Sequence, residues 1–125
     1  MSITLNKQYY LGVRDEVQPV EKVLQYCLIA PGWNQIITDL LLDLDKPEMV
    51  WDGRITQVKE KYGSLRFYIG GATTAVFDRI HEAERLTAKT CMICGKPGKI
   101  YTGGWWQALC KEHAAAGGYT DGDED

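Results

Sequence analysis

The chain has 125 residues, of which 45% are hydrophobic and 25% charged, and this balance suits one globular domain with a modest core. Its apolar runs are only a few residues long, so we expect no transmembrane helix. The net charge is −3, and it comes from the acidic residues close to the C-terminus. Without them the rest of the chain is nearly neutral. Strong non-specific binding to duplex DNA needs a clearly basic surface, so we do not expect it here.

The first half of the chain predicts two helices. In the segment 18–28 apolar side chains recur at helical spacing, namely at Val20, Val23, Leu24, Cys27 and Leu28. After Pro31-Gly32 a second set follows the same spacing, namely Ile36, Ile37, Leu40, Leu41 and Leu44. We expect Asn34 to be the N-cap of this second helix and Trp33 to fill one end of the contact between the two helices. Residues 1–13 have no clear period and predict either a terminal strand or an irregular arm.

Residues 54–69 predict a β-hairpin that turns at Tyr62-Gly63. A two-residue turn places Val58 opposite Phe67, and the face that they share is expected to pack on the helices. The other face would carry the candidate binding residues Lys59, Lys61, Arg66 and Tyr68, beside Gln57. Lys59 would lie directly opposite Arg66, and like charges in that position are mildly destabilising. The pair therefore suggests an anionic partner, although a solvated sheet face is the alternative.

A third helix is expected to begin at Thr73 or Thr74, after Gly70-Gly71 ends the hairpin. Its buried side chains would be Val76, Phe77, Ile80 and Ala83. His81 falls on the charged side of this helix, where a lone histidine is most often solvated. The helix continues through residues 87–90 into a cysteine-rich segment, so we expect the hairpin, the helix and that segment to form one unit.

The cysteine-rich segment carries four candidate metal ligands, Cys91, Cys94, Cys110 and His113, in the pattern C-x2-C-x15-C-x2-H. Zinc prefers such a set, because thiolates and imidazoles in paired short spacings can complete a tetrahedron. Four protein ligands leave no open position for a catalytic water, so the expected zinc is structural. A disulfide is disfavoured, since the start of the chain lacks the basic and apolar segments of a secretory leader and we expect a cytoplasmic protein.

The residues around the ligands predict a zinc finger of the treble-clef type. Gly95 suits a cysteine knuckle, Ile100-Tyr101 and the segment 105–109 suggest a short hairpin, and good helix formers follow Cys110. On a strand Trp105 and Trp106 would point to opposite faces, and we expect Trp105 to be buried against the third helix and Trp106 exposed. The fold class is thus α+β, with a body at 1–89, a finger at 90–116 continuous with it, and an acidic flexible tail at 117–125.

Several stretches, QVKEKYGSLRFYIGG, EAERLTAKTC, CMICGKPG and LCKEHA, together resemble a group of small uncharacterised proteins of bacteriophages and prophages. The resemblance covers about residues 54–114, while the first 53 residues match only loosely. The matching positions are the four metal ligands together with Lys59, Lys61, Gly63, Leu65, Arg66, Phe67, Tyr68 and Trp105. The group has no established activity, but its phage context implies an accessory role such as blocking a host factor or defence system.

Binding is the expected function, because the motifs of zinc deaminases, phosphate-binding loops and nucleophilic triads do not occur in the sequence. The first hypothesis is a phage-type accessory protein that occludes a host protein, possibly a defence protein, in the bacterial cytoplasm. The alternative is a protein that binds a nucleotide or single-stranded nucleic acid. In that case Lys59, Lys61 and Arg66 would contact phosphates, and Tyr68 or Trp106 would stack on a base.

Overall fold

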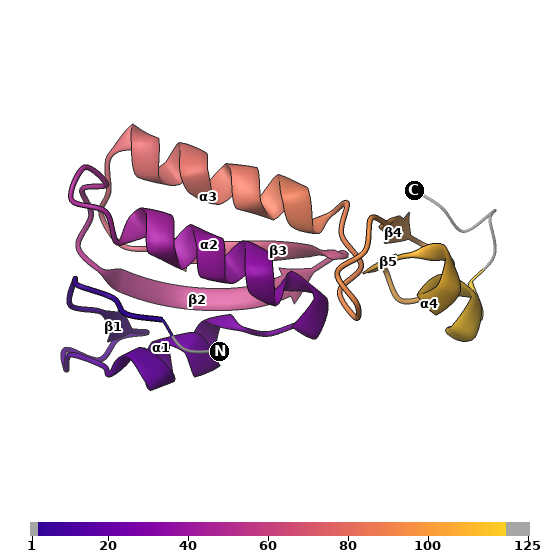
Figure 1. Cartoon of the computed structure of the whole chain (residues 1–125), viewed down its shortest axis with the longest axis horizontal. Coiled ribbons are helices and arrows are strands. Elements are labelled where there is room, and N and C mark those ends of the chain that lie inside the picture. Colours follow the sequence, from indigo (N-terminus) through magenta and orange to yellow (C-terminus); the bar gives the residue numbers. More distant parts are fainter. Residues whose placement is uncertain (1–2, 120–125) are drawn as a thin grey trace.

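The computed structural model describes residues 3–119 and has a mixed α+β fold. A three-stranded sheet carries helices on one face, and a smaller two-stranded sheet with a short helix lies at one end of the molecule (Figure 1). The helices are α1 (Val20–Cys27), the 3₁₀ helix η1 (Pro31–Trp33), α2 (Asn34–Leu44), α3 (Thr74–Thr87) and α4 (Lys111–Ala116). The strands are β1 (Tyr10–Leu11), β2 (Arg54–Lys61), β3 (Ser64–Ile69), β4 (Lys99–Tyr101) and β5 (Gln107–Leu109). Within this part of the chain no helix is both long and apolar enough to cross a bilayer.

The predicted β2–β3 hairpin is present in the expected register. Val58 lies opposite Phe67, and Lys59 lies opposite Arg66. Tyr62 and Gly63 have φ values of 53° and 87°, which are the two left-handed positions of a type I′ turn. Tyr62, a residue that adopts this conformation less readily than glycine or asparagine, thus occupies the first turn position. The turn nevertheless has the two-residue length that sets the register of the hairpin.

A β-bulge in β2 explains why two residues three positions apart both face the core. The pairing shifts between Ile55, which lies opposite Ile69, and Gln57, which lies opposite Tyr68. The extra residue between them reverses the alternation along the strand, so that Ile55 is fully buried and Val58 packs against the same core. Strand β1 extends the sheet on the other side of β2 by a short parallel pairing, so the N-terminal segment contributes a strand, one of its two expected forms.

Helix α3 protects the outer edge of the sheet. Strand β3 is an edge strand, so alternate backbone N–H groups have no partner strand. Leu65 N donates to Thr87 Oγ1 at 3.0 Å and Phe67 N donates to Glu84 Oε2 at 2.9 Å. These side chains of α3 take the place of a further strand, which removes a surface to which other chains could add.

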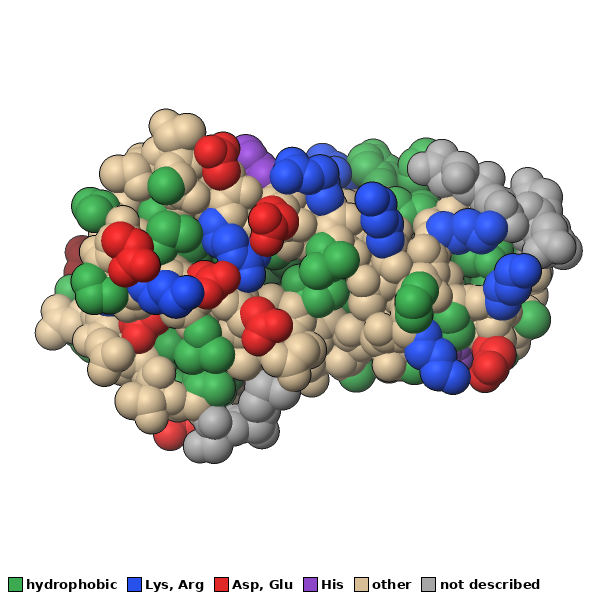
Figure 2. Space-filling view, turned by 45° about the horizontal axis from the view of Figure 1, so that its top comes forward, with side chains coloured by type: hydrophobic (Ala, Val, Ile, Leu, Met, Phe, Trp, Pro, Cys, Tyr) green, Lys and Arg blue, Asp and Glu red, His purple; other side chains and the backbone are tan. Residues whose placement is uncertain are grey.

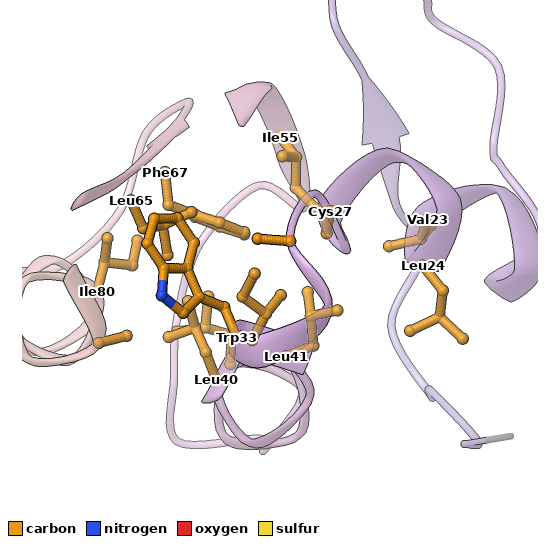
Figure 3. Packing of buried hydrophobic residues seen from close by; sticks show 14 of the residues in the cluster. Val23, Leu24, Cys27, Trp33, Leu40, Leu41, Ile55, Leu65, Phe67 and Ile80 are labelled. Carbon is orange, nitrogen blue, oxygen red and sulfur yellow. The ribbon is translucent and has the colours of Figure 1, made fainter. Parts of the chain in front are cut away.

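The core lies between the sheet and helices α1, α2 and α3, and Trp33 is among its largest fully buried side chains. Figure 3 shows the Trp33 ring among Leu40 of α2, Leu65 of β3 and Ile80 of α3. The ring is fully buried, and its Nε1 donates to the carbonyl oxygen of Thr90 at 2.9 Å. Trp33 therefore lies at the N-terminal end of α2 and links this helix and α3 to the sheet.

Two details of the predicted helices were wrong. Asn34 has helical dihedral angles (φ −54°, ψ −43°) and lies inside the first turn, while Trp33 stands at the N-cap of α2. The reason is that η1 runs directly into α2, so Asn34 is already helical and its buried Oδ1 has no hydrogen-bond partner among residues 3–119. The side chain of Phe77 is partly exposed rather than buried, whereas Val76, Ile80 and Ala83 of α3 face the core as expected.

Asp45 fastens the N-terminal segment to the end of α2. Its carboxylate, only 7% exposed, accepts hydrogen bonds from the backbone N–H groups of Asn6 and Lys7 and from the Tyr9 hydroxyl at 2.7 Å. Burial raises the pKa of Asp45, but these hydrogen bonds outweigh it and the pKa lies below its ordinary value. The charged carboxylate therefore contributes to the stability of the fold.

Replacing Asp45 by asparagine should lower the free energy of unfolding by about 2 kcal/mol at pH 7, because charge-assisted hydrogen bonds to a buried group are lost. The folded pKa is below the unfolded one, so this contribution is complete above about pH 4 and disappears as pH falls through the folded pKa. The difference between wild type and Asp45→Asn in urea denaturation should therefore shrink at pH 3. Asp78→Asn, an exposed change on α3, is the control; an equal loss for both variants at pH 7 would contradict this role of Asp45.

Candidate metal centre and contact face

The four predicted ligands come together in the structure. Cys91 and Cys94 lie in the turn after α3, Cys110 immediately precedes α4, and His113 lies in that helix. Their ligand atoms all lie within 4.8 Å of one another, so the cluster could hold a metal ion. Cys91 and Cys110 are buried, His113 is half-buried and Cys94 is exposed.

The distances within the cluster suit a tetrahedral ion. Cys94 Sγ lies 3.8 Å from Cys110 Sγ. His113 Nδ1 lies 3.5 Å from Cys91 Sγ and 3.3 Å from Cys110 Sγ. Metal–sulfur bonds of about 2.3 Å and metal–nitrogen bonds of about 2.0 Å at tetrahedral angles give edges of about 3.8 Å and about 3.5 Å. The donor set and its spacing therefore fit a four-coordinate ion.

The backbone of the knuckle, residues 91–95, favours a thiolate at Cys91. Gly95 N donates to the Cys91 carbonyl oxygen at 2.9 Å, and the φ of +83° at Gly95 turns the chain there so that the Lys96 carbonyl oxygen accepts from Cys91 N at 2.8 Å. Burial raises the pKa of the Cys91 thiol, but the backbone N–H groups of Cys94 and Cys110 outweigh it and help to lower the pKa to about 6. The thiolate is the form that binds metal, so the local backbone prepares this ligand.

The expected hairpin and helix follow the knuckle. Strands β4 and β5 pair in antiparallel fashion, with Ile100 opposite Ala108, and α4 begins directly after Cys110. A small second core holds these elements together and consists of Cys91, Tyr101, Leu109, Cys110 and Ala114. We call the segment 90–116 the finger. Of the expected acidic tail, residues 117–119 are described, and the rest lies outside the described residues.

The knuckle is seated on the η1 turn of the body. Gly32 N donates to the Met92 carbonyl oxygen at 2.8 Å, next to the bond from Trp33 to Thr90. The approach is so close that a Cβ atom on Gly32 would lie 1.9 Å from the carbonyl oxygen of Cys91. Ala108 of the finger also belongs to the main core. The finger and the body are therefore packed as one unit.

Trp105 does not occupy its predicted place. Both tryptophans lie in the loop between β4 and β5, and Trp105 is 75% exposed while Trp106 is 42% exposed. Strand β5 begins only at Gln107, so the two indoles do not alternate across a strand. The expected burial of Trp105 against the third helix was therefore wrong. The Trp106 ring instead makes a T-shaped contact with the Tyr62 ring at the tip of the β2–β3 hairpin, with ring centroids 5.6 Å apart.

The predicted binding residues lie on the outer face of the hairpin. Lys59 Nζ lies 5.8 Å from the centre of the Tyr68 ring, and Lys61 Nζ lies 5.6 Å from that of Tyr62. Within residues 3–119, Lys59, Lys61 and Arg66 have no ion pair with an acidic side chain. The Arg66 guanidinium instead donates to Ser64 Oγ at 3.0 Å.

A surface hollow connects this face to the finger. It has a volume of about 390 Å³ and is lined by Glu60, Lys61, Tyr62, Gly104, Trp105 and Trp106. We define the contact face as Lys59, Lys61, Tyr62, Arg66, Tyr68 and Trp106. The sequence analysis missed Tyr62, because it was assigned only to the turn, and its exposed ring becomes a binding candidate only when the finger loop is placed beside it.

Comparison of the chain with protein-family models, with curated proteins and with solved structures finds no match in any of the three. Its function therefore has to be inferred from the chemistry of the metal centre and the contact face.

Replacing Cys94 by serine should weaken metal binding by at least about tenfold and reduce the thiolate charge-transfer intensity, because a weaker oxygen ligand would then take the fourth position. Cobalt(II) titrated into metal-depleted wild type should bind about one ion per chain and produce thiolate charge-transfer bands with a tetrahedral d–d spectrum. The matched control is Cys27→Ala, because Cys27 lies outside the cluster and burial raises its thiol pKa to about 12. The cluster would not be a metal site if Cys94→Ser and Cys27→Ala gave the same cobalt spectrum.

Replacing Gly32 by alanine should lower the free energy of unfolding by more than about 3 kcal/mol, because the new methyl group would overlap the Cys91 carbonyl oxygen and the backbone around it. Urea denaturation followed by Trp fluorescence measures the change. Gly71→Ala is the control, since the nearest atom to its Cβ would be 3.9 Å away. A loss of less than about 1 kcal/mol for Gly32→Ala, the size expected of an ordinary surface change, would contradict a tight seat for the knuckle.

Proposed function

We propose that this chain is a zinc-stabilised binding protein, in which a treble-clef-like finger holds a structural zinc ion. Three thiolates and one imidazole form a donor set that zinc prefers. The four ligands would fill a tetrahedron and leave no position for a substrate or catalytic water. The order of a knuckle, the β4–β5 hairpin and α4 supports the treble-clef comparison. The ion would then stabilise the surface that the finger shares with the hairpin.

One observation carries the proposal of binding at the contact face: its cations lack acidic partners while others in the molecule have them. Arg79 Nε lies 2.6 Å from Asp43 Oδ2, and Arg54 Nη2 lies 2.7 Å from Asp15 Oδ1. Among the described residues the cations of the contact face form no such pair, although Lys59 and Arg66 face one another across the hairpin. Such an arrangement costs folding free energy and is relieved by an acidic partner.

The aromatic side chains of the contact face favour a protein partner. Tyr62, Tyr68 and Trp106 are all more than two-fifths exposed, at 62%, 41% and 42%. Tyrosine and tryptophan are enriched among the residues that contribute most to protein–protein affinity, and arginine joins them. The resemblance to phage and prophage proteins supports the further step that the partner is a host protein, possibly of a defence system, which the chain would occlude in the bacterial cytoplasm.

A nucleotide or a single-stranded nucleic acid is the second candidate ligand. It is favoured by the contact between the Tyr62 and Trp106 rings, which lies beside the ammonium group of Lys61. Aromatic platforms next to cations bind single strands, because bases stack on the rings while the cations contact the phosphates. The near-neutral charge of the body restricts this candidate to short or single-stranded ligands.

Lys61→Ala and Trp106→Ala should each weaken capture of the partner from bacterial lysate by about tenfold or more, while changing the melting temperature by less than about 3 °C, since both side chains are exposed. The control is Lys22→Ala, which removes an exposed lysine of α1 outside the contact face. A short single-stranded oligonucleotide added as competitor separates the two candidates: it should displace a nucleic acid but leave an acidic protein bound. Capture that neither contact-face variant changes would reject this surface as the binding site.

A further inference from the structure

A second hollow lies beside the contact face, in the angle between β3 and α3. It has a volume of about 280 Å³ and is lined by Ser64 and Arg66 of β3 and by His81, Glu84, Arg85 and Ala88 of α3. The hydrogen bonds from Leu65 and Phe67 to α3 hold these two elements together along the whole hollow. The side chains that line it are therefore held by rigid elements rather than by loops.

The hollow has an excess of positive charge. Arg66 and Arg85 form no ion pair within the described part of the chain, and the Glu84 carboxylate is the only acidic group in the lining. One oxygen of Glu84 is occupied, since Oε2 accepts the hydrogen bond from Phe67 N at 2.9 Å. Figure 2 shows the wider setting: acidic side chains gather over one half of this face of the molecule, while Lys and Arg side chains continue along α3 toward the finger.

We propose that this hollow binds the phosphate group of a small phosphomonoester. Two guanidinium groups, from the half-buried Arg66 and the exposed Arg85, offer planar pairs of N–H donors that match phosphate oxygens. Ser64 Oγ already accepts a hydrogen bond from Arg66 Nη1 at 3.0 Å, which leaves its hydroxyl hydrogen to donate to the bound anion. His81 is exposed at the rim and offers a further donor.

The size of the hollow restricts the ligand. Sites that enclose a whole small molecule have volumes of roughly 300–1,000 Å³, and this hollow lies just below that range, so we expect a small ligand whose charged group occupies it. Arg66 belongs to both the hollow and the contact face, so the inference deepens the proposed function through that one residue. Arg85 and Ser64 lie outside the contact face, and they allow the two proposals to be tested separately.

The test uses the full-length protein labelled with ¹⁵N and titrated with inorganic phosphate, adenosine 5′-monophosphate and adenosine. Both phosphates should shift the backbone amide signals of Ser64, Arg66 and Arg85 with a Kd of about 10 mM or tighter, and adenosine should not. Binding of adenosine 5′-monophosphate at least about tenfold tighter than inorganic phosphate would assign a nucleotide as the ligand; equal binding would assign free phosphate or another phosphomonoester.

Two variants of α3 decide whether the hollow is the site. Arg85→Ala should weaken phosphate binding by about tenfold or more, because it removes a charge-assisted donor pair, and its exposed position means that the fold is kept. Glu84→Gln should tighten binding by a few-fold, because it removes the opposing charge yet retains an acceptor for Phe67 N. A residue with a merely structural role would not increase affinity when replaced.

Lys61→Ala and Trp106→Ala serve as the controls, because both side chains lie outside this hollow and should leave phosphate binding unchanged within about twofold. The inference would be overturned if Arg85→Ala left phosphate binding unchanged or if Glu84→Gln weakened it. It would also be overturned if phosphate caused no amide shifts around Ser64. If instead these variants behave as expected while capture of the lysate partner is unaffected by Lys61→Ala and Trp106→Ala, the proposed contact face is rejected and the phosphate site remains.

Discussion

The contact between the knuckle and the η1 turn is the constraint on which the rest of the structure depends. The carbonyl oxygens of Thr90 and Met92 accept hydrogen bonds from Trp33 and Gly32, and no side chain at position 32 would allow the same approach. Because Trp33 is also buried in the main core, the position of the cysteines is tied to the packing of the helices and the sheet. Binding of a metal ion would therefore stabilise the whole chain rather than the finger alone.

Helix α3 has two structural roles that lead to the same surface. It covers the core with Ile80 and Ala83, and its Thr87 and Glu84 side chains satisfy the outer N–H groups of β3. Because α3 runs beside the edge of β3, one side of this helix lies next to the outer face of the sheet. Arg85 of α3 thereby adds a positive charge beside the cations of the hairpin. The edge of β3, which α3 covers, forms one wall of the hollow between them.

Ion pairs are unevenly distributed over the described part of this molecule. Asp43 of α2 and Glu82 of α3 pair with Arg79, whereas Lys59, Lys61 and Arg66 have no acidic partner within residues 3–119. A single exposed lysine needs no explanation, because surface ion pairs contribute little to stability. Several cations held on rigid strands beside exposed rings are different, because their mutual repulsion costs folding free energy that a bound anionic partner would relieve.

Local patterns in the sequence determined the helices, the hairpin register and the ligand set, because each depends on residues close together in the chain. Helical periodicity identified α1, α2 and α3, the two-residue turn set Lys59 opposite Arg66, and the paired cysteine spacing identified the metal ligands. Tertiary structure alone decided how these parts meet. The exposure of Trp105 and the placement of Arg85 and Ser64 around one hollow depend on contacts between segments far apart in the sequence, and local propensity carries no information on such contacts. Asn34 is different, because the 3₁₀ turn directly before α2 makes it helical and prevents it from being the N-cap.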